Sequence, residues 1–250
     1  MELLTGDVAV WRVAATPANS RAAEAARAAL SEEETRRAGT FHKPADRALY
    51  LVAHVALRLL LGEQLGLPAG AVVLGRAACP GCGGPHGRPV TVSGPSVEFS
   101  LSHTGGLAVI ALARDVVGVD VEQRGPFEEA AGLDIASQLH PAERAVLDGL
   151  PQERRAEATL RCWVRKEAYL KGTGVGLSQG VDADYVGLGP EYPGLAGGAS
   201  LPAEPAGWGF GDVPVPDGYA AAVALRLPDG VRTPRVVSSD LDLGQPVRIG

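Results

Sequence analysis

Apolar residues follow a strand-like pattern in five short segments of the chain. Alternating or continuous apolar residues, bounded by turn-forming residues, are typical of strands. The pattern predicts strands at residues 8–13, 97–102, 107–113, 116–122 and 219–227. A glycine-rich turn at residues 104–106 lies between the second and third of these strands, so we expect it to join them directly.

Apolar residues at helical spacing predict helices in both halves of the chain. The predicted helices cover residues 22–30, a segment that starts at residue 31, residues 47–65, a segment that starts near residue 141, and residues 151–171. Ser31 and Glu34 have the spacing of a capping box, and glycines at 172 and 174 mark a helix end. Together with the strands, these segments predict an α+β protein.

The remaining segments lack a periodic pattern. Residues 75–95 and 187–218 are rich in glycine and proline, which predicts loops, and residues 228–250 are expected to form a weakly ordered tail. The length of 250 residues fits one large domain or two small ones. A composition of 46% apolar and 21% charged residues is ordinary for a folded soluble protein.

Charge and targeting features narrow the class of function. The net charge of −6 argues against nucleic acid as a general partner, although arginines and lysines cluster locally and suit a discrete anionic ligand. The chain start has no signal-peptide pattern, and no apolar run approaches the ~20 residues of a membrane span. We therefore expect a cytoplasmic protein that does not contact membranes.

Two acidic residues share one face of a predicted strand. Side chains alternate along residues 116–122, so the valines point to one side while Asp120 and Glu122 point to the other. Glu167 lies on or beside the apolar stripe of the helix at residues 151–171. Three carboxylates next to a core suit a hard divalent cation such as Mg²⁺, which commonly also contacts substrate phosphates.

Simpler interpretations exist for these acids. Asp120 and Glu122 could form a solvated strand end, and Glu167 could pair with Lys171 four residues later along the helix. Lysine usage argues otherwise, because the chain has 3 lysines against 20 arginines, and two of those lysines, Lys166 and Lys171, flank Glu167. Lysine is a common point-charge ligand of phosphate, so the pattern favours an anionic substrate.

The three cysteines leave open whether the chain binds zinc. Cys79, Cys82 and His86 resemble half of a zinc site, and Cys162 is the remaining cysteine that could supply another thiolate. A structural zinc site normally has four protein ligands. A turn-rich loop with reduced thiols is the favoured interpretation, and zinc is the alternative.

Further phosphate-binding candidates lie upstream of the acidic strand. Ser102 and His103 stand where a predicted strand meets a turn, and Arg88 stands in the glycine-rich loop. A hydroxyl, an imidazole and a guanidinium can each donate hydrogen bonds to phosphate oxygens. Each of these residues alone would be unremarkable, so their order along the chain is what matters.

In that order, four motifs resemble the 4′-phosphopantetheinyl transferases of the Sfp type. The motifs are Gly-Arg-Pro at residues 87–89, Phe-Ser-Leu-Ser-His at 99–103, Gly-Val-Asp-Val-Glu at 118–122 and Trp-Val-Arg-Lys-Glu-Ala-Tyr-Leu-Lys at 163–171. Residues 41–47 look like the segment of that family that contacts coenzyme A. The resemblance covers residues 30–180, and the pair of acidic motifs, 45 residues apart from Glu122 to Glu167, is its most specific part.

The resemblance implies two similar α/β halves related by a pseudo-twofold axis, with the active site in the cleft between them. The corresponding division of this chain is residues 1–115, which would carry the coenzyme A-binding elements, residues 116–227, which would carry the metal-binding strand and helix, and a tail at 228–250. A single chain of this kind is expected to act as a monomer.

The resemblance also implies a reaction. The phosphopantetheine arm of coenzyme A would pass to a serine of an apo acyl or peptidyl carrier protein, with release of 3′,5′-ADP, in fatty acid, polyketide or nonribosomal peptide synthesis. Asp120, Glu122 and Glu167 would hold Mg²⁺, and Glu167 would also be the base. The remaining groups would bind coenzyme A, with the phosphates contacted by Arg88, Ser102, His103 and Lys171, and the 3′-phosphate end by Lys43, Arg47 and Arg36.

A different enzyme class could use the same three carboxylates. A metal-dependent phosphohydrolase would release phosphate products from coenzyme A or a nucleotide without any carrier protein. The sequence does not identify the carrier protein.

Overall fold

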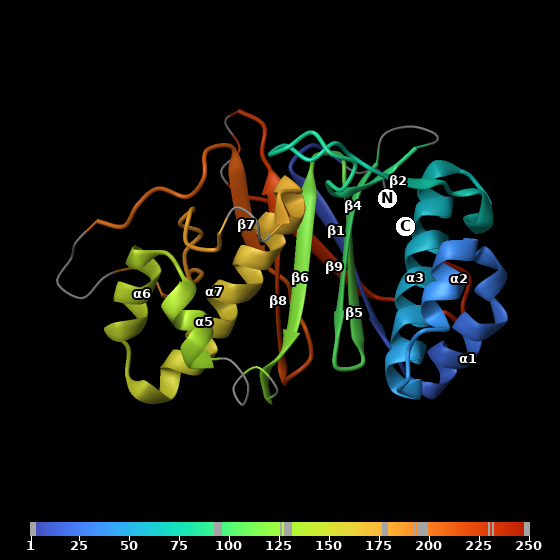
Figure 1. Ribbon diagram of the computed structural model, residues 1–250, viewed down its shortest axis with the longest axis horizontal. Helices are drawn as coiled ribbons and strands as arrows, with labels where there is room; N and C mark the ends of the chain where they lie inside the picture. Colours follow the sequence, from blue (N-terminus) through green and yellow to red (C-terminus); the bar gives the residue numbers. More distant parts are fainter. Residues whose placement is uncertain are drawn as a thin grey trace.

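In a computed structural model of the chain, helices flank two β-sheets that pack face to face (Figure 1). The structure describes residues 4–92, 97–125, 127, 132–176, 180–192, 194, 200–229, 231 and 233–247. The order of layers is helix, sheet, sheet, helix. This mixed architecture confirms the α+β prediction, while the pseudo-twofold relation of two halves stays a prediction.

The first sheet has four strands in the order β4-β5-β1-β9. Its strands are β1 (Asp7–Ala14), β4 (Glu98–Thr104), β5 (Leu107–Ala113) and β9 (Arg235–Asp240). β5 pairs antiparallel with both β1 and β4, and a tight turn at Gly105 and Gly106 joins β4 to β5 as the sequence predicts. β1 pairs in parallel with β9 on its other side.

The second sheet has three antiparallel strands in the order β6-β8-β7. Its strands are β6 (Val117–Gln123), β7 (Trp208–Asp212) and β8 (Tyr219–Arg226). Valines from β1, β5, β6 and β8 fill the space between the two sheets, among them Val10, Val109, Val119 and Val223. Because strand side chains alternate, this packing turns Asp120 and Glu122 away from the inter-sheet core.

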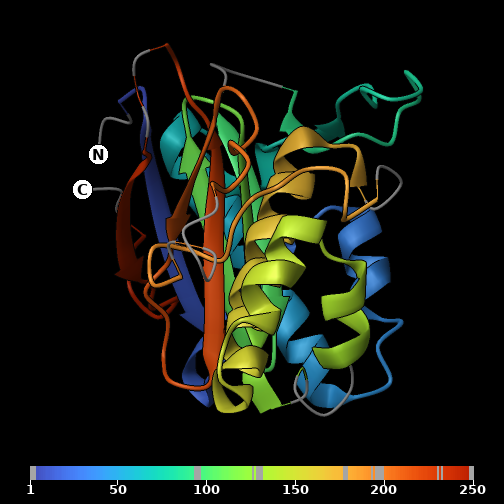
Figure 2. The ribbon, with the colours of Figure 1, turned by 90° about the vertical axis from the view of Figure 1, so that its left-hand side faces the viewer.

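Helices cover the outer face of each sheet (Figure 2). α3 (Pro44–Leu65) packs on the first sheet, where Val55 and Leu60 meet Trp11 and Ile110. By length and composition α3 could cross a membrane, but 67% of its apolar stretch is buried inside the protein, as in a core helix. α7 (Gln152–Thr173) packs on the second sheet through Leu160, Val164 and Ala168.

Shorter elements complete the fold. α1 (Pro17–Ala25) and α2 (Glu32–Ala38) lie beside α3, and α5 (Gly132–Gln138) and α6 (Pro141–Asp148) lie beside α7. The described residues also form a small hairpin, β2 (Leu74–Arg76) with β3 (Pro89–Thr91), and two 3₁₀ helices, η1 (Arg27–Ala29) and η2 (Ala69–Ala71). The capping box of Ser31 and Glu34 is confirmed, because each side chain accepts a hydrogen bond from the other's backbone N–H.

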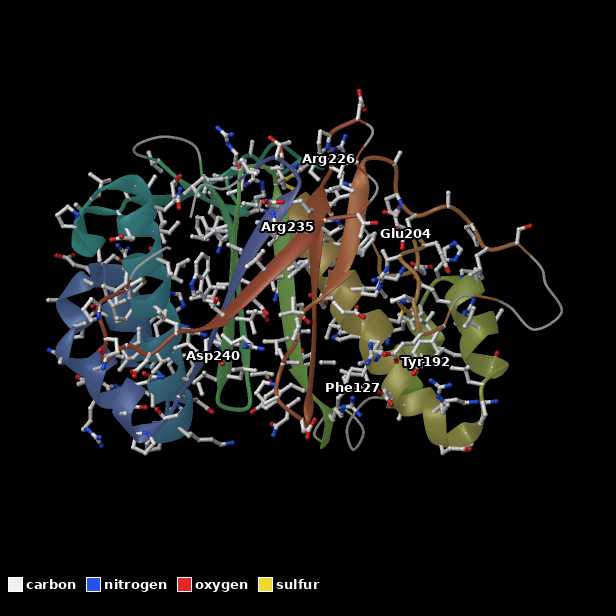
Figure 3. The ribbon with its side chains drawn as sticks, turned by 180° about the vertical axis from the view of Figure 1, so that it is seen from behind. Phe127, Tyr192, Glu204, Arg226, Arg235 and Asp240 are labelled. Carbon is white, nitrogen blue, oxygen red and sulfur yellow. The ribbon has the colours of Figure 1, made fainter. Side chains whose placement is uncertain are left out.

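Four sequence-based predictions differ from the structure. The helix expected at residues 22–30 begins at Pro17 and gives way to η1, because Thr16 supplies the N-cap. The segment at 75–95 contains the β2–β3 hairpin, and that at 187–218 contains β7. The prediction of a weakly ordered tail is wrong for Arg235–Asp240, which form β9 across the back of the molecule (Figure 3). β9 forms through backbone pairing with β1, and such pairing does not require a strong apolar pattern in the strand's own sequence.

A close approach between β6 and α7 fixes the position of the acidic strand relative to the helix. A Cβ atom at Gly118 would overlap the carbonyl oxygen of Ala168 and lie 2.6 Å from the backbone nitrogen of Gly172. The lack of a side chain at Gly118 therefore lets the helix backbone rest on the strand.

Gly118→Ala is expected to lower the free energy of unfolding by about 1–3 kcal/mol or more, because backbone atoms must move to admit the methyl group. Urea denaturation followed by circular dichroism measures the change. Gly125→Ala is the matched control, since a Cβ there would meet no atom of the described residues within 4 Å. Equal stability of the two variants would contradict the close packing of α7 on β6.

Candidate active site

Side chains from β4, β6 and α7 meet at one buried carboxylate. Asp120 on β6 is 3% exposed, and its Oδ1 atom accepts hydrogen bonds from Ser102 Oγ at 2.8 Å and Lys171 Nζ at 2.6 Å. The Lys171 ammonium also donates to Ser102 Oγ at 2.9 Å. Ser100, two residues earlier on β4, accepts from the backbone N–H of Val119 and ties β4 to β6. The structure thus joins three residues that the sequence analysis singled out.

The second carboxylate oxygen of Asp120 has no hydrogen-bond partner among the described residues, although it is buried. A buried acceptor without a donor is costly and calls for an explanation, such as a bound ion. This atom is therefore the feature that best supports cation binding at the site.

The electrostatics of the three acids agree with that interpretation. Burial raises the pKa of Asp120, although Lys171 and Ser102 oppose the shift. Burial and the nearby Asp120 raise the pKa of Glu122 to about 7, and the same two causes raise the pKa of Glu167. One ammonium group does not offset three neighbouring carboxylates, and a divalent cation would do so.

The carboxylate oxygens of these three acids do not form one compact cluster. Within the described part of the chain, the oxygens of Asp120, Glu122 and Glu167 do not all lie within 4.8 Å of one another. The residue types still fit a hard cation, which takes oxygen ligands and waters.

Lys166 does not take part in this site, which corrects the pairing of Lys166 and Lys171 around Glu167. The Lys166 ammonium is buried, bonds to Glu143 at 3.0 Å and donates to the carbonyl of Asp184. Glu143 in turn accepts from the backbone N–H groups of Val186 and Gly187. Burial and the nearby Asp120 raise the pKa of Glu167, and of the two lysines only Lys171 opposes this shift.

A cleft of about 1640 Å³ opens beside the acidic cluster. Its walls come from α2, α3, the β2–β3 hairpin, β4 and the C-terminal end of α7. Of the predicted residues, those that line it are Arg36, Arg88, His103, Glu167 and Lys171. Asp120, Glu122 and Ser102 do not line it. Asp120 and Ser102 are hydrogen-bonded to Lys171, which does.

His103 and Arg88 both line the cleft, and their surroundings affect them differently. Burial lowers the pKa of His103, and the charges of His54 and Lys171 lower it further, so the neutral imidazole is favoured. Both terminal nitrogens of the Arg88 guanidinium bond to Glu98, and the bond from Nη2 to Oε1 measures 3.1 Å. Arg88 is thereby oriented before any substrate binds.

The structure does not bring Lys43 and Arg47 to the cleft. Arg47 pairs with Glu24 of α1 at 3.2 Å, and Lys43, the N-cap of α3, is exposed and absent from the lining. Arg36 does line the cleft, beside Arg37, which the sequence analysis did not assign to the site. Helix α3 presents its first turn to α1 instead of the cleft, and only the packing of α1 against α3 reveals this.

Arg76 and His54 also line the cleft without having been assigned to it. Arg76 stands in a glycine-rich stretch with no local signal, and it donates to the carbonyl of Gly87 at 3.0 Å. His54 lies on α3, where its ring stacks on Tyr50 with centroids 4.0 Å apart. A histidine in a largely apolar helical segment is the sequence feature that could have identified His54 as a site residue.

Glu34 anchors the wall that α2 and α3 form. Its carboxylate accepts from Arg58 Nε at 2.6 Å and lies 3.3 Å from His54 Nδ1. Burial alone would raise the pKa of Glu34, but hydrogen bonds from His54, the Ser31 backbone and Arg58 lower it from 4.5 to about 2. The ionised carboxylate is therefore part of the folded structure.

Stability is expected to depend on this carboxylate at acidic pH. The pKa of Glu34 is lower in the folded state than in the unfolded chain, so its contribution is complete above about pH 4.5 and disappears as the pH falls towards 2. Thermal melts between these pH values should show Glu34→Gln losing less stability on acidification than the parent protein. Glu33→Gln, at an exposed neighbouring position, should follow the parent, and identical slopes for all three proteins would contradict the assignment.

Comparisons with known proteins point to one family. Residues 116–223 match the family model of the 4′-phosphopantetheinyl transferase superfamily, and residues 16–115 match that of the 4′-phosphopantetheinyl transferase N-terminal region. The 4′-phosphopantetheinyl transferase HetI of Nostoc sp. is 30% identical over 229 residues, 90% of each chain. The 4′-phosphopantetheinyl transferase psf-1 of Bacillus pumilus is 30% identical over 155 residues, 62% of each chain. The human L-aminoadipate-semialdehyde dehydrogenase-phosphopantetheinyl transferase is 26% identical over 84% of this chain and 72% of its own length.

Proposed function

The chain belongs to the 4′-phosphopantetheinyl transferases, and we propose that its acidic site uses Mg²⁺ to move the phosphopantetheine arm of coenzyme A onto a carrier-protein serine. As a member of this family it is an enzyme that takes coenzyme A as substrate and acts on carrier proteins. The metal, the roles of individual residues, the class of carrier protein, the monomeric state and a cytoplasmic location are proposals.

One observation supports the metal above all others. The buried Oδ2 atom of Asp120 has no hydrogen-bond partner in the described part of the chain, and two further acids lie near it. Asp120, Glu122 and Glu167 would hold the Mg²⁺ ion. The ion would supply positive charge for the pyrophosphate of coenzyme A and stabilise the ADP that leaves.

The protein's own cations would position the pyrophosphate in the cleft. Lys171 is held by Asp120 and Ser102 at the cleft wall, so its ammonium is fixed where an anionic group can reach it. Arg88, oriented by Glu98, and His103, whose neutral imidazole can still donate one N–H, would contact phosphate oxygens. Preoriented donors of this kind favour charge development in phosphoryl transfer.

Glu167 would accept the proton of the carrier serine. Glu167 lines the cleft one helical turn before Lys171, where the hydroxyl of a bound carrier serine would reach it. In the step, the serine oxygen forms a bond to the β-phosphorus as the bond from that phosphorus to 3′,5′-ADP breaks. The serine proton passes to Glu167.

Intact-mass measurement tests the reaction directly. The protein, coenzyme A, Mg²⁺ and an apo carrier protein should yield a carrier heavier by one phosphopantetheine arm and an equal amount of 3′,5′-ADP. Adding EDTA should stop the reaction, and a panel of acyl and peptidyl carriers should reveal the preferred class. Turnover of coenzyme A without any carrier would instead indicate a phosphohydrolase, and full activity in EDTA would overturn the role of the metal.

A further inference from the structure

A second group of metal-ligating side chains lies on the loop between β2 and β3, outside the acidic site. The loop closes on itself through hydrogen bonds from Cys79 N to Gly84 O and from Gly83 N to Cys79 O, both 2.8 Å long. Gly83 has a φ of +73°, a left-handed conformation that favours glycine, and it allows the chain to reverse within four residues. The loop projects from one end of the molecule (teal in Figure 2).

The closed loop gathers two sulfurs and one imidazole. Cys82 Sγ lies 3.0 Å from His86 Nε2, and the donor atoms of Cys79, Cys82 and His86 all lie within 4.8 Å of one another. Backbone N–H groups of Cys82 and Gly81 lower the pKa of the Cys79 thiol, and Gly84 N donates to Cys82 Sγ at 3.4 Å. Each sulfur therefore has backbone donors beside it.

We propose that Cys79, Cys82 and His86 bind a Zn²⁺ ion through two sulfurs and one nitrogen, with a water molecule as the fourth ligand. Thiolate and imidazole are the ligands that zinc prefers, whereas Mg²⁺ prefers the oxygens of the acidic site. The three side chains come from a single tight loop, so little chain entropy opposes their meeting. None of the three is one of the acids Asp120, Glu122 and Glu167, although His86 also lines the cleft.

The ion would secure the end of the hairpin that carries Arg88. Gly87 N donates to Ala77 O and Ala77 N donates to Arg88 O, both at 3.0 Å, so the loop and the Arg88 backbone form one unit. A Cβ at Gly87 would lie 2.6 Å from the Ala77 carbonyl oxygen, which shows how closely the two segments approach. Zinc at Cys79, Cys82 and His86 would thus hold the loop at residues 77–88 against the cleft.

Metal analysis of variants tests the proposal. The parent protein, prepared with Zn²⁺ and passed through a desalting column, should retain about one zinc ion per chain. Cys82→Ser and His86→Ala change exposed residues, so the fold should survive, and each should lose the bound zinc. Cys162→Ala, which removes a buried thiol elsewhere, and His42→Ala, which removes an exposed imidazole, should retain it.

A second readout identifies the ligands. Co²⁺ in place of zinc should give sulfur-to-cobalt charge-transfer absorption in the parent and both controls, and Cys82→Ser should weaken this absorption. Amide hydrogen exchange at residues 77–88 should accelerate when zinc is removed. Three results would each overturn the proposal: no retained zinc in the parent, as much zinc in the Cys82→Ser and His86→Ala variants as in the parent, or a Cys79–Cys82 disulfide in the freshly purified protein.

Discussion

Replacing Asp120 by Asn is expected to reduce phosphopantetheine transfer by about 10²–10³-fold or more. The substitution keeps the shape of the side chain and its contacts with Ser102 and Lys171, but it removes the charge that would hold the cation. Initial rates of holo-carrier formation at saturating coenzyme A measure the effect. Asp148→Asn, at an exposed position at the end of α6, should retain the parent rate.

A binding measurement separates loss of the metal site from loss of the fold. Mg²⁺ should raise the melting temperature of the parent protein, since a ligand that binds only the folded state stabilises it. The Asp120→Asn variant should fold, because a buried charge next to two other acids is removed, and Mg²⁺ should no longer shift its melting temperature. An unchanged Mg²⁺ shift, or an unchanged transfer rate, would remove Asp120 from the metal site.

Replacing Lys166 by Met is expected to lower the free energy of unfolding by about 3–5 kcal/mol, because it leaves the Glu143 carboxylate buried without its cation. Lys166 and Glu143 side chains are 2% and 0% exposed, so water cannot compensate for the lost partner. Urea denaturation of the parent and variant measures the difference. Transfer activity per folded molecule should change little, since Lys166 does not reach the cleft.

Lys171→Met is the matched comparison on the same helix. Its ammonium is 33% exposed and contacts Asp120 and Ser102, so we expect a large loss of transfer even per folded molecule. The loss of stability should be at most comparable to that of Lys166→Met, because the more exposed Lys171 site admits water. The two lysine variants should therefore differ in transfer activity per folded molecule. A specific loss of activity in a stable Lys166→Met protein would contradict the assignment of Lys166 to the core.

Helix geometry explains why the two lysines differ. Lys171 follows Glu167 by four residues and so lies on nearly the same face of α7, whereas Lys166 is rotated by about 100° from Glu167. Their closeness in sequence suggested a common role, but the rotation carries Lys166 into the core beside α6. The sequence fixes the angle between the two side chains around the helix axis. The packing of α6 against α7 decides that Lys166 meets Glu143.

Strand alternation, by contrast, predicted the acidic strand well. The valines of β6 are buried between the sheets, and this arrangement places Asp120 and Glu122 on the side of α7. The sequence also predicted the β4–β5 turn and the capping box of α2, because hydrogen bonds and torsion preferences of neighbouring residues determine such features. Local signals failed for β9, an edge strand that forms by pairing with a distant partner.

By itself, the sequence determined the residue types of the site, the strand and helix that carry them, and the motifs shared with the transferase family. The tertiary structure decided which of these groups meet. Ser102 and Lys171 are 69 positions apart and form a hydrogen bond only because β4 lies beside β6 and α7 packs on Gly118. It also turned Arg47 towards Glu24 and away from the cleft. Periodicity along one element fixes the face on which a side chain lies, whereas the partner on that face depends on how distant elements pack.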